Sequence, residues 1–372
     1  MKKVGIITFH RAINYGAKLQ AYALQEVLKE KCDISIIDYR CPFIENSYYG
    51  KKNKVSLKTI IKYLFFYGKI RRIKKEKDKL YLKFNNFDQK FLILSEKEYF
   101  QNNISEANNV YDIFISGSDQ VWNLRMTGHD WNYYLDFAEE RKKYSYAASF
   151  GGDILNEDAN NIGLKLKHFQ SILVREDRGA KIVYDTTNRK VLTVCDPVFL
   201  IRKEEWISGL NLNKEKLNEK YVLLAEVAPM TYSFEFAKKL AKKENLKIYY
   251  INIKGRIKLP YGFKCLNSIG PCEFLDLILN ASYVVTTSFH ALAYSLIFNV
   301  PFFYELDKSI VNNNDRIINL VDELKIEKRE ITSKVLSGDY NNRLDWNKIN
   351  SIIEDYSCRS KEILFKSLNI MQ

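Results

Sequence analysis

The sequence lacks the cysteine and histidine patterns of a metal site or a disulfide framework. Its six cysteines form no CxxC pair, and none of its four histidines stands at the spacing of a zinc site. Scattered cysteines in a chain of this length are usually small buried apolar residues. We therefore predict neither a bound metal nor a metal-dependent functional site.

The chain also has no long uninterrupted hydrophobic run, and we expect no secretory signal. Residues 1–3 lead directly into the apolar run 4–8, which is shorter than the hydrophobic region of a signal peptide. The longest apolar stretch, residues 283–306, is interrupted by polar side chains that a membrane span would leave without partners. We expect a cytoplasmic protein, at most peripheral at the inner face of the cell membrane.

The sequence contains a large fraction of apolar residues, arranged in short segments. Apolar residues make up 46% and aromatic residues 14% of the 372 positions, which excludes global disorder. A chain this long exceeds one hydrophobic core, so we expect two domains. Short apolar runs predict buried strands at 4–9, 34–39, 111–116, 143–150, 171–174, 191–194, 221–227, 246–253, 283–287 and 301–304.

Helical periodicity lies between many of these runs, so strand and helix alternate twice along the chain. We predict an α/β protein made of two Rossmann-like domains that face a cleft. The first domain spans residues 1–205 and the second spans 218–345, with the charged segment 202–220 as the linker. Residues 346–372 are expected to end the chain as a helix.

The net charge of +13 is concentrated in one segment. Residues 51–90 hold 14 Lys/Arg and 3 Asp/Glu, a local charge of 14 − 3 = +11. A nucleic-acid enzyme more often spreads basic residues along its cleft, so we expect no nucleic-acid partner. This basic helical insertion has two interpretations. It is a solvated pair of helices packed on the first domain, or residues 51–79 form an amphipathic surface that rests on anionic lipid headgroups.

Polar residues follow several of the predicted strands. In open α/β sheets, ligands bind at the carboxyl ends of strands. The turn 286–290, Thr-Thr-Ser-Phe-His, lies at such an end, as do Asp119, Arg175 and Asp196. We predict that this strand-to-helix turn belongs to an active site.

Five segments in order give the chain a family resemblance. They are 14–16 with 19–24, 117–123, 174–176, 195–197, and 288–295 continuing to 299–302. Together they resemble the polysaccharide pyruvyl transferases, and the resemblance runs from about residue 4 to about residue 325. It implies a fold like that of the GT-B glycosyltransferases, with an acceptor-side first domain and a donor-side second domain.

The resemblance also implies an activity. Members transfer a pyruvyl group from phosphoenolpyruvate to a sugar of a bacterial surface polysaccharide or its lipid-linked precursor, usually forming a cyclic ketal. Phosphoenolpyruvate is then a co-substrate, and no cofactor is implied. Many members carry an arginine two positions before the histidine, where this chain has Ser288. Arg175, Arg256 and Arg316 are the candidates to replace it in donor binding.

Four residues have competing interpretations as catalytic or donor-binding groups. His290 suits an acid/base, because imidazole titrates near pH ~6.5 and both accepts and donates protons; the alternative is a core histidine bonded to backbone. Asp119 can act as base or orient a sugar hydroxyl, or it can cap a helix. Arg175 can clamp an anion or pair with Glu176 or Asp177. Ser288 can bond the donor phosphate at the helix N-terminus.

The acceptor side is assigned to residues of two turns. Candidates are Asn14, Tyr15, Gly16, Gln120 and Trp122, although Gly16 serves equally well as a close strand-helix turn. The main rival function is a GT-B-type glycosyltransferase that uses a nucleotide sugar. A third candidate function is that of a non-catalytic subunit of a polysaccharide-assembly complex.

Overall fold

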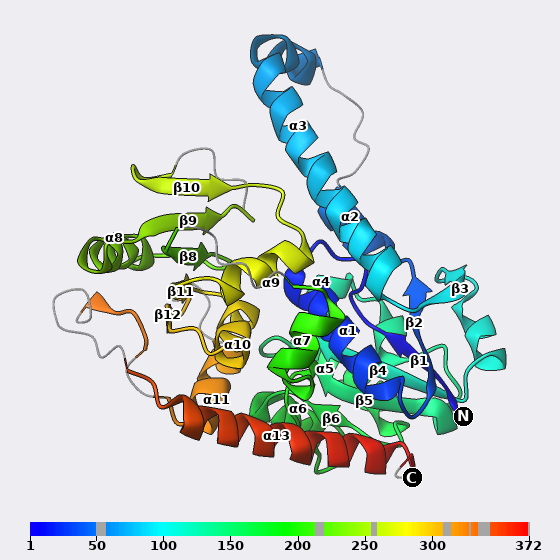
Figure 1. Cartoon of the computed structure of the whole chain (residues 1–372). Coiled ribbons are helices and arrows are strands. Elements are labelled where there is room, and N and C mark those ends of the chain that lie inside the picture. Colours follow the sequence, from blue (N-terminus) through cyan, green and yellow to red (C-terminus); the bar gives the residue numbers. More distant parts are fainter. Residues whose placement is uncertain are drawn as a thin grey trace.

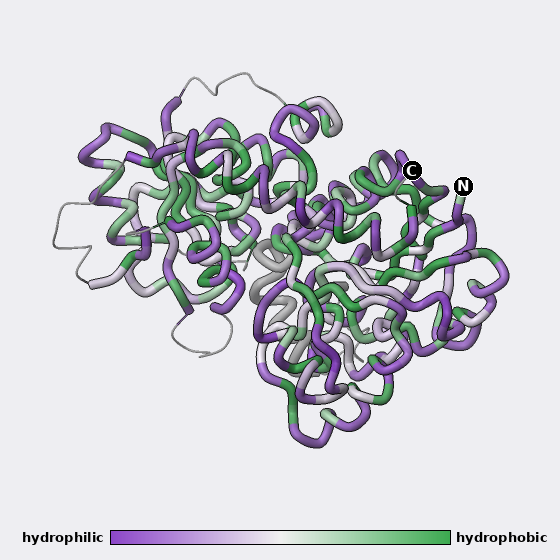
Figure 2. The backbone as a smooth tube through the Cα atoms, turned by 90° about the horizontal axis from the view of Figure 1, so that it is seen from below, coloured by the Kyte–Doolittle hydropathy of each residue, from purple (hydrophilic) through white to green (hydrophobic). Residues whose placement is uncertain are grey.

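The computed structural model describes residues 1–49, 57–212, 219–253, 259–307, 314–326, 329–333 and 343–370, with side chains described outside 49–70. The chain forms two parallel sheets, which lie in two lobes with apolar segments inside (Figure 2). Arg256 and residues 50–56 lie outside the described part.

The first sheet has seven parallel strands in the order β3-β2-β1-β4-β5-β6-β7. Its strands are β1 (Lys3–Ile7), β2 (Asp33–Tyr39), β3 (Leu94–Tyr99), β4 (Ile113–Asp119), β5 (Lys143–Ala148), β6 (Leu173–Val174) and β7 (Leu192–Thr193). The helices of this part are α1 (Tyr15–Leu28), α2 (Pro42–Tyr49), α3 (Leu57–Phe91), α4 (Leu124–Thr127), α5 (Asn156–Lys167) and α6 (Asp177–Thr187). Single 3-10 turns are η1 (Ile104–Asn109), η2 (Trp131–Tyr134), η3 (Glu140–Lys142) and η4 (Pro197–Leu200).

The second sheet has five parallel strands in the order β10-β9-β8-β11-β12. They are β8 (Tyr221–Ala225), β9 (Lys247–Ile251), β10 (Phe263–Leu266), β11 (Tyr283–Thr286) and β12 (Phe302–Tyr304). The later helices are α7 (Lys203–Gly209), α8 (Ser233–Glu244), α9 (Pro271–Leu279), α10 (Phe289–Ile297), α11 (Asp315–Glu323) and α13 (Trp346–Ser367). The predicted class, two Rossmann-like α/β units, is confirmed.

Both sheets reverse their strand order at one point. The reversal lies between β1 and β4 in the first sheet and between β8 and β11 in the second. Chain crossovers then leave in opposite directions, which opens a crevice at the carboxyl ends of the two central strands. The polar residues predicted for the site follow β1, β4 and β11, so topology places them at these crevices.

Two strands were not predicted. β3 (LSEKEY) and β10 (FKCL) are edge strands; β3 is rich in polar and charged residues, and β10 is only four residues long with a lysine among them. Edge strands commonly carry charge, which discourages pairing with other chains and removes the apolar run that marks a buried strand. The expected linker 202–220 contains α7, whose Trp206 is fully buried and packs on Tyr22 and Tyr294.

The basic segment contains a single long helix rather than a pair. α3 runs for 35 residues, and Figure 1 shows its first half projecting from the body. Its last turns pack on α1 through Phe84 and Phe87. It also reaches the second unit, because Lys83 pairs with Glu273 of α9 at 2.5 Å. Among the helices that the structure describes, none has the length and apolar character needed to cross a bilayer.

The N-terminus of α1 contacts the second unit directly. The Tyr15 ring stacks on Phe274 of α9 with centroids 4.3 Å apart, and its hydroxyl donates to the carbonyl of Ile269 at 2.8 Å. At the other end of the chain, the backbone N–H of Cys195 donates to Ser360 of α13 at 3.0 Å. The two sheets are thus joined by packed helices as well as by chain connectivity.

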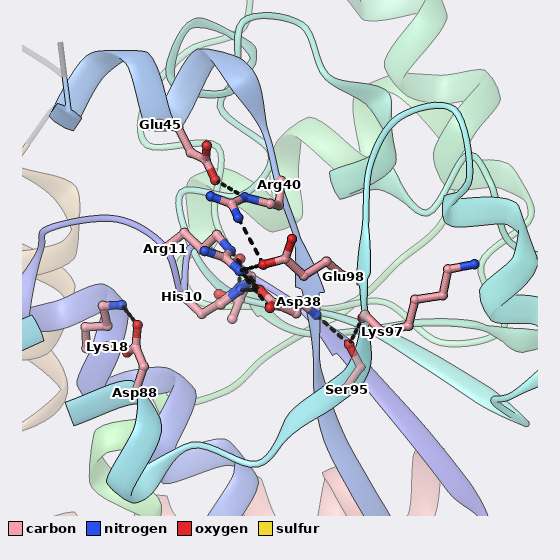
Figure 3. A network of polar contacts seen from close by, with 11 residues as sticks. His10, Arg11, Lys18, Asp38, Arg40, Glu45, Asp88, Ser95, Lys97 and Glu98 are labelled. Carbon is pink, nitrogen blue, oxygen red and sulfur yellow. Dashed lines mark hydrogen bonds and ion pairs between the residues drawn. The ribbon is translucent and has the colours of Figure 1, made fainter. Parts of the chain in front are cut away.

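A buried charge network holds the turn between β1 and α1 (Figure 3). The Asp38 carboxylate accepts from both sides: His10 Nε2 lies 3.0 Å away, and Arg11 donates through two nitrogens at 2.7 Å each. Burial alone would raise the pKa of Asp38, but the hydrogen bonds and charges of His10 and Arg11 outweigh it, so the pKa lies below its ordinary value. His10 and Arg11 both belong to the turn 9–14, so their contacts with Asp38 hold that turn in place.

We predict that Asp38→Asn lowers the free energy of unfolding at pH 7 by about 3 kcal/mol, because a buried imidazole and guanidinium lose their shared partner. Since the folded-state pKa of Asp38 is below the unfolded value, this contribution is complete above about pH 4 and is lost as the pH falls through the folded pKa. Urea unfolding at pH 7 and at about pH 3 measures the difference, which should shrink at the lower pH.

The control is Glu98→Gln. Glu98 is 47% exposed and pairs with Arg11 in the same network, so its loss should cost less than about 1 kcal/mol. A loss in Asp38→Asn that stays equal at both pH values would contradict the proposed ion pairing.

Candidate active site

A cleft of about 870 Å³ lies where the two switch points face each other. Its walls come from the turn after β1, the ends of β4 and β5, the loops after β8 and β11, and α11. The predicted residues that line it are Asn14, Tyr15, Gly16, Asp119, Gln120, Trp122, Ser288, His290 and Arg316. The topology therefore brings together residues separated by up to 300 positions.

His290 stands in the first turn of α10 and packs on the other unit. A Cβ on Gly16 would lie 2.0 Å from its Nδ1, so the ring approaches as closely as it does only because Gly16 has no side chain. His290 is 7% exposed, and its buried Nε2 has no hydrogen-bond partner. That atom lies 3.7 Å from Asp196 Oδ2, beyond hydrogen-bond distance. The alternative interpretation, a core histidine hydrogen-bonded to the backbone, is therefore not observed at Nε2.

Asp196 was noted in a motif but was not predicted as a site residue. Its Oδ2 accepts from Arg175 at 2.8 Å and faces His290, and it is 2% exposed. Burial would raise the pKa of this carboxyl, but His290 and Arg175 outweigh that effect and lower it. An ionised Asp196 can orient the imidazole. Its position just after β7 was the signal that could have identified it.

Arg175 is held by the carboxylates of the protein itself. It bonds Asp196, lies 3.4 Å from Glu176, and lies 3.7 Å from Asp119. Burial would lower its pKa, but the three carboxylates outweigh burial and raise it. One nitrogen, Nη2, is buried without a hydrogen-bond partner. The ion-pair interpretation with Glu176 is therefore observed, and one donor remains unused.

Arg316 is the second cation of the cleft and comes from α11. Its side chain is 18% exposed, and Nη1 lies 3.8 Å from Asp119 Oδ1. Burial and then the charge of Arg175 lower its pKa. Both guanidinium groups lie over the Phe289 ring, at 5.4 Å for Arg175 and 6.0 Å for Arg316. Of the three arginines proposed to replace the missing one, Arg316 faces the cleft most openly, while Arg256 is outside the described residues.

Asp119 has a strained backbone at the end of β4. Its φ is +66°, a left-handed value that is uncommon for residues other than glycine. The following helix α4 is capped by Asn123, whose Oδ1 accepts from the N–H of Arg125 at 3.2 Å. The helix-cap interpretation of Asp119 is therefore wrong, and its carboxylate faces the two arginines instead.

Of the acceptor-side candidates, Asn14 and Gln120 make polar contacts, whereas Tyr15 and Trp122 are held in aromatic packing. Asn14 is exposed and caps α1, accepting from the N–H of Ala17 at 3.2 Å, and Gln120 contacts Asn123 at 3.0 Å. The ring and the hydroxyl of Tyr15 are both used in its contact with α9 and the residues before it. Trp122 is 1% exposed and stacks on Tyr134, so it belongs to the core behind the wall of the cleft.

Two helices of the second unit, α8 and α10, have N-termini that point toward the cleft region, and these N-termini are capped differently. At α8, the Glu305 carboxylate accepts from the N–H of Thr231 at 2.7 Å and of Ser233 at 2.9 Å, and from the Ser233 hydroxyl at 2.5 Å. At α10, Ser288 Oγ caps the N–H of Ala291 at 3.3 Å. Free N–H groups and the helix dipole favour anions. Glu305 therefore occupies the N-terminus of α8, whereas the N-terminus of α10 carries no carboxylate cap and lines the cleft.

Metal ligation finds no support in the side-chain arrangement. Within the described ranges, no group of three or more His, Cys, Asp or Glu side chains is placed to hold a metal ion.

Solved structures with a similar fold share little sequence. The UDP-GlcNAc 2-epimerase of Rickettsia bellii aligns with a TM-score of 0.53 and 10% identity over 99% of this chain and 96% of that one. The enzyme of Methanocaldococcus jannaschii, solved with UDP-GlcNAc and UDP, gives 0.51 and 12% over 99% of both chains. At this identity the likeness concerns the GT-B fold alone.

No curated protein matches the sequence. The family model for polysaccharide pyruvyl transferases, however, matches residues 14–304. That range runs from the cap of α1 to the end of β12 and covers most of both sheets. The chain therefore belongs to the polysaccharide pyruvyl transferase family.

Proposed function

We propose that this protein transfers a pyruvyl group from phosphoenolpyruvate to a sugar of a bacterial surface polysaccharide or its lipid-linked precursor, forming a ketal. The observation that carries the proposal is the meeting of Arg175, Arg316 and His290 at the N-terminus of α10. Phosphoenolpyruvate brings a carboxylate and a phosphate, for which Arg316 and the helix end supply donors, while His290 beside them carries the proton.

The reaction needs two hydroxyls and one proton relay. One sugar hydroxyl attacks the central carbon while the methylene takes up a proton to become a methyl group. The second hydroxyl then displaces phosphate, which leaves with the remaining proton. Atoms and charge balance without an oxidant or a cofactor.

The side chains of the cleft suit separate roles in this scheme. His290 gives the proton to the methylene, and Asp196 orients its ring. Asp119 accepts the proton of the attacking hydroxyl. Arg316 binds the donor anion in place of the arginine missing at Ser288, and Arg175, which does not line the cleft, holds Asp119 and Asp196 in position behind it. Asn14 and Gln120 present polar groups to the acceptor.

A GT-B-type glycosyltransferase using a nucleotide sugar is the competing function. The solved relatives include an epimerase bound to UDP-GlcNAc, so the fold accommodates such donors. The family match favours the pyruvyl donor. Turnover with a nucleotide sugar but none with phosphoenolpyruvate would refute the proposal.

We predict that His290→Gln lowers phosphate release by about 10²–10⁴-fold, the range lost with a general acid/base. Binding of phosphoenolpyruvate, measured by calorimetry, should change little. Arg316→Ala should weaken that binding by about 10-fold or more, since a charged hydrogen bond contributes roughly 1.5–3 kcal/mol. His168→Gln changes a surface histidine that is 41% exposed and serves as the control. Unchanged turnover in His290→Gln removes that residue from the mechanism.

Gly16→Ala tests the contact between the two units. The added Cβ would lie 2.0 Å from the imidazole, so the His290 ring must move. A displacement of about 1 Å can cost about 10²-fold in rate, so turnover should fall by that order while the protein stays folded. Gly179→Ala is the control, because its Cβ would meet nothing closer than 3.4 Å. Equal activity in both variants would show that the Gly16 contact has no catalytic role.

The proposal includes an anionic membrane surface as partner of residues 51–79. Arg71, Arg72, Lys74 and Lys75 are exposed on α3, and Ile73 is 52% exposed among them. Basic residues near an anionic bilayer contribute about 1 kcal/mol each. A lipid-linked acceptor would then be reached from the membrane surface.

We predict that the protein sediments with anionic vesicles at low salt. Replacing the four basic residues 71, 72, 74 and 75 by glutamine should remove most of that binding, because screening and charge loss act on the same attraction. Equal sedimentation with neutral vesicles would contradict an electrostatic surface contact.

A further inference from the structure

A second groove, of about 630 Å³, lies in the second unit away from the catalytic cleft. It runs between α8 and the first residues of β9 and β10, whereas the cleft lies at the carboxyl ends of the strands. β10 is the edge strand of its sheet, on the outside of the molecule (Figure 1). The residues that give the groove its chemistry are Lys238, Lys242, Asn245, Lys247, Tyr261 and Lys264.

Four lysines converge on this groove, and all four are exposed. Lys238 and Lys242 are one helical turn apart on α8, where like charges repel each other. Lys247 pairs with Glu219, and Lys264 lies over the Tyr249 ring at 4.5 Å. Among the described residues, Glu219 is the carboxylate that pairs with an ammonium group of the groove, so the groove residues carry a net positive charge and an anionic ligand would relieve the repulsion.

The rim of the groove carries an accessible aromatic ring. Tyr261 is 99% exposed, and the next residue, Gly262, has a φ of +92° with nothing within 4 Å of the position of a Cβ. An open tyrosine presents an apolar face and a polar hydroxyl. Such a ring beside ammonium groups fits a sugar ring that carries a carboxylate.

We propose that this groove, lined by Lys238, Lys242, Lys247, Lys264 and Tyr261, binds an anionic saccharide chain. The assignment of its natural ligand rests on the proposed function, since each ketal leaves one carboxylate on the sugar. The product chain is therefore more anionic than the acceptor. The groove retains the modified chain on the protein while the next sugar enters the cleft.

The test uses polygalacturonate, a saccharide chain with one carboxylate per sugar, and measures its binding to the full-length protein by calorimetry at low salt. Uncharged dextran and polyuridylate are the comparison ligands. We expect polygalacturonate to bind and dextran not to bind. The double variant Lys238→Gln/Lys242→Gln should bind at least about 10-fold more weakly, as expected if two charge-assisted contacts are lost.

The matched control is Lys239→Gln/Lys243→Gln, which removes the same charge from the same helix outside the groove. It should keep the affinity of the native protein. Equal losses in the two double variants would overturn the proposal, because binding would then follow net charge alone. Polyuridylate binding as tight as polygalacturonate binding would also overturn it, in favour of a nucleic-acid surface.

Tyr261→Ala separates sugar recognition from charge attraction. It should weaken polygalacturonate binding without changing the net charge, and an unchanged affinity would remove the aromatic contact from the proposal. None of these measurements uses phosphoenolpyruvate. If binding fails while phosphate release is retained, only the groove assignment is lost. If binding holds while phosphoenolpyruvate gives no turnover, the pyruvyl assignment is lost instead.

Discussion

The close packing of His290 on Gly16 is the contact on which the rest of the site depends. It joins the first turn of α1, at the switch point of one sheet, to the first turn of α10, at the switch point of the other. Any residue with a Cβ at position 16 would push the ring away. The stacking of Tyr15 on Phe274 stabilises the same approach, so the two crevices form one cleft.

Charge balance in the cleft follows from this approach. Three carboxylates, on Asp119, Glu176 and Asp196, face the guanidinium groups of Arg175 and Arg316. Buried charges are stable only when they are paired and hydrogen-bonded. Glu176 and Asp196 contact Arg175, and Asp119 lies within 4 Å of both Arg175 and Arg316. The carboxylates therefore hold both guanidinium groups in place beside His290.

The sequence predicted those parts of the fold that depend on local pattern. Buried strands such as β4 and β8 contain continuous apolar runs, so their positions were recognisable, whereas the polar edge strand β3 and the four-residue edge strand β10 were not. Pairings between distant residues lay beyond local pattern. Glu305 caps α8 from more than 70 positions away, and nothing near position 305 signals that role. Asp196 was visible in a motif, but its contact with Arg175 was not.

The replacement of an arginine by Ser288 is understandable from the position of that residue. Ser288 is the N-cap of α10, where a hydroxyl satisfies the N–H of Ala291. The positive charge that the loop before α10 lacks is supplied from α11, whose Arg316 extends across the cleft toward Asp119. Because Arg316 and Asp119 belong to different units, the cation is correctly placed only when the units are together. Under the proposed function, donor binding by Arg316 would be coupled to the packing of the two units, which an arginine on the α10 loop would not require.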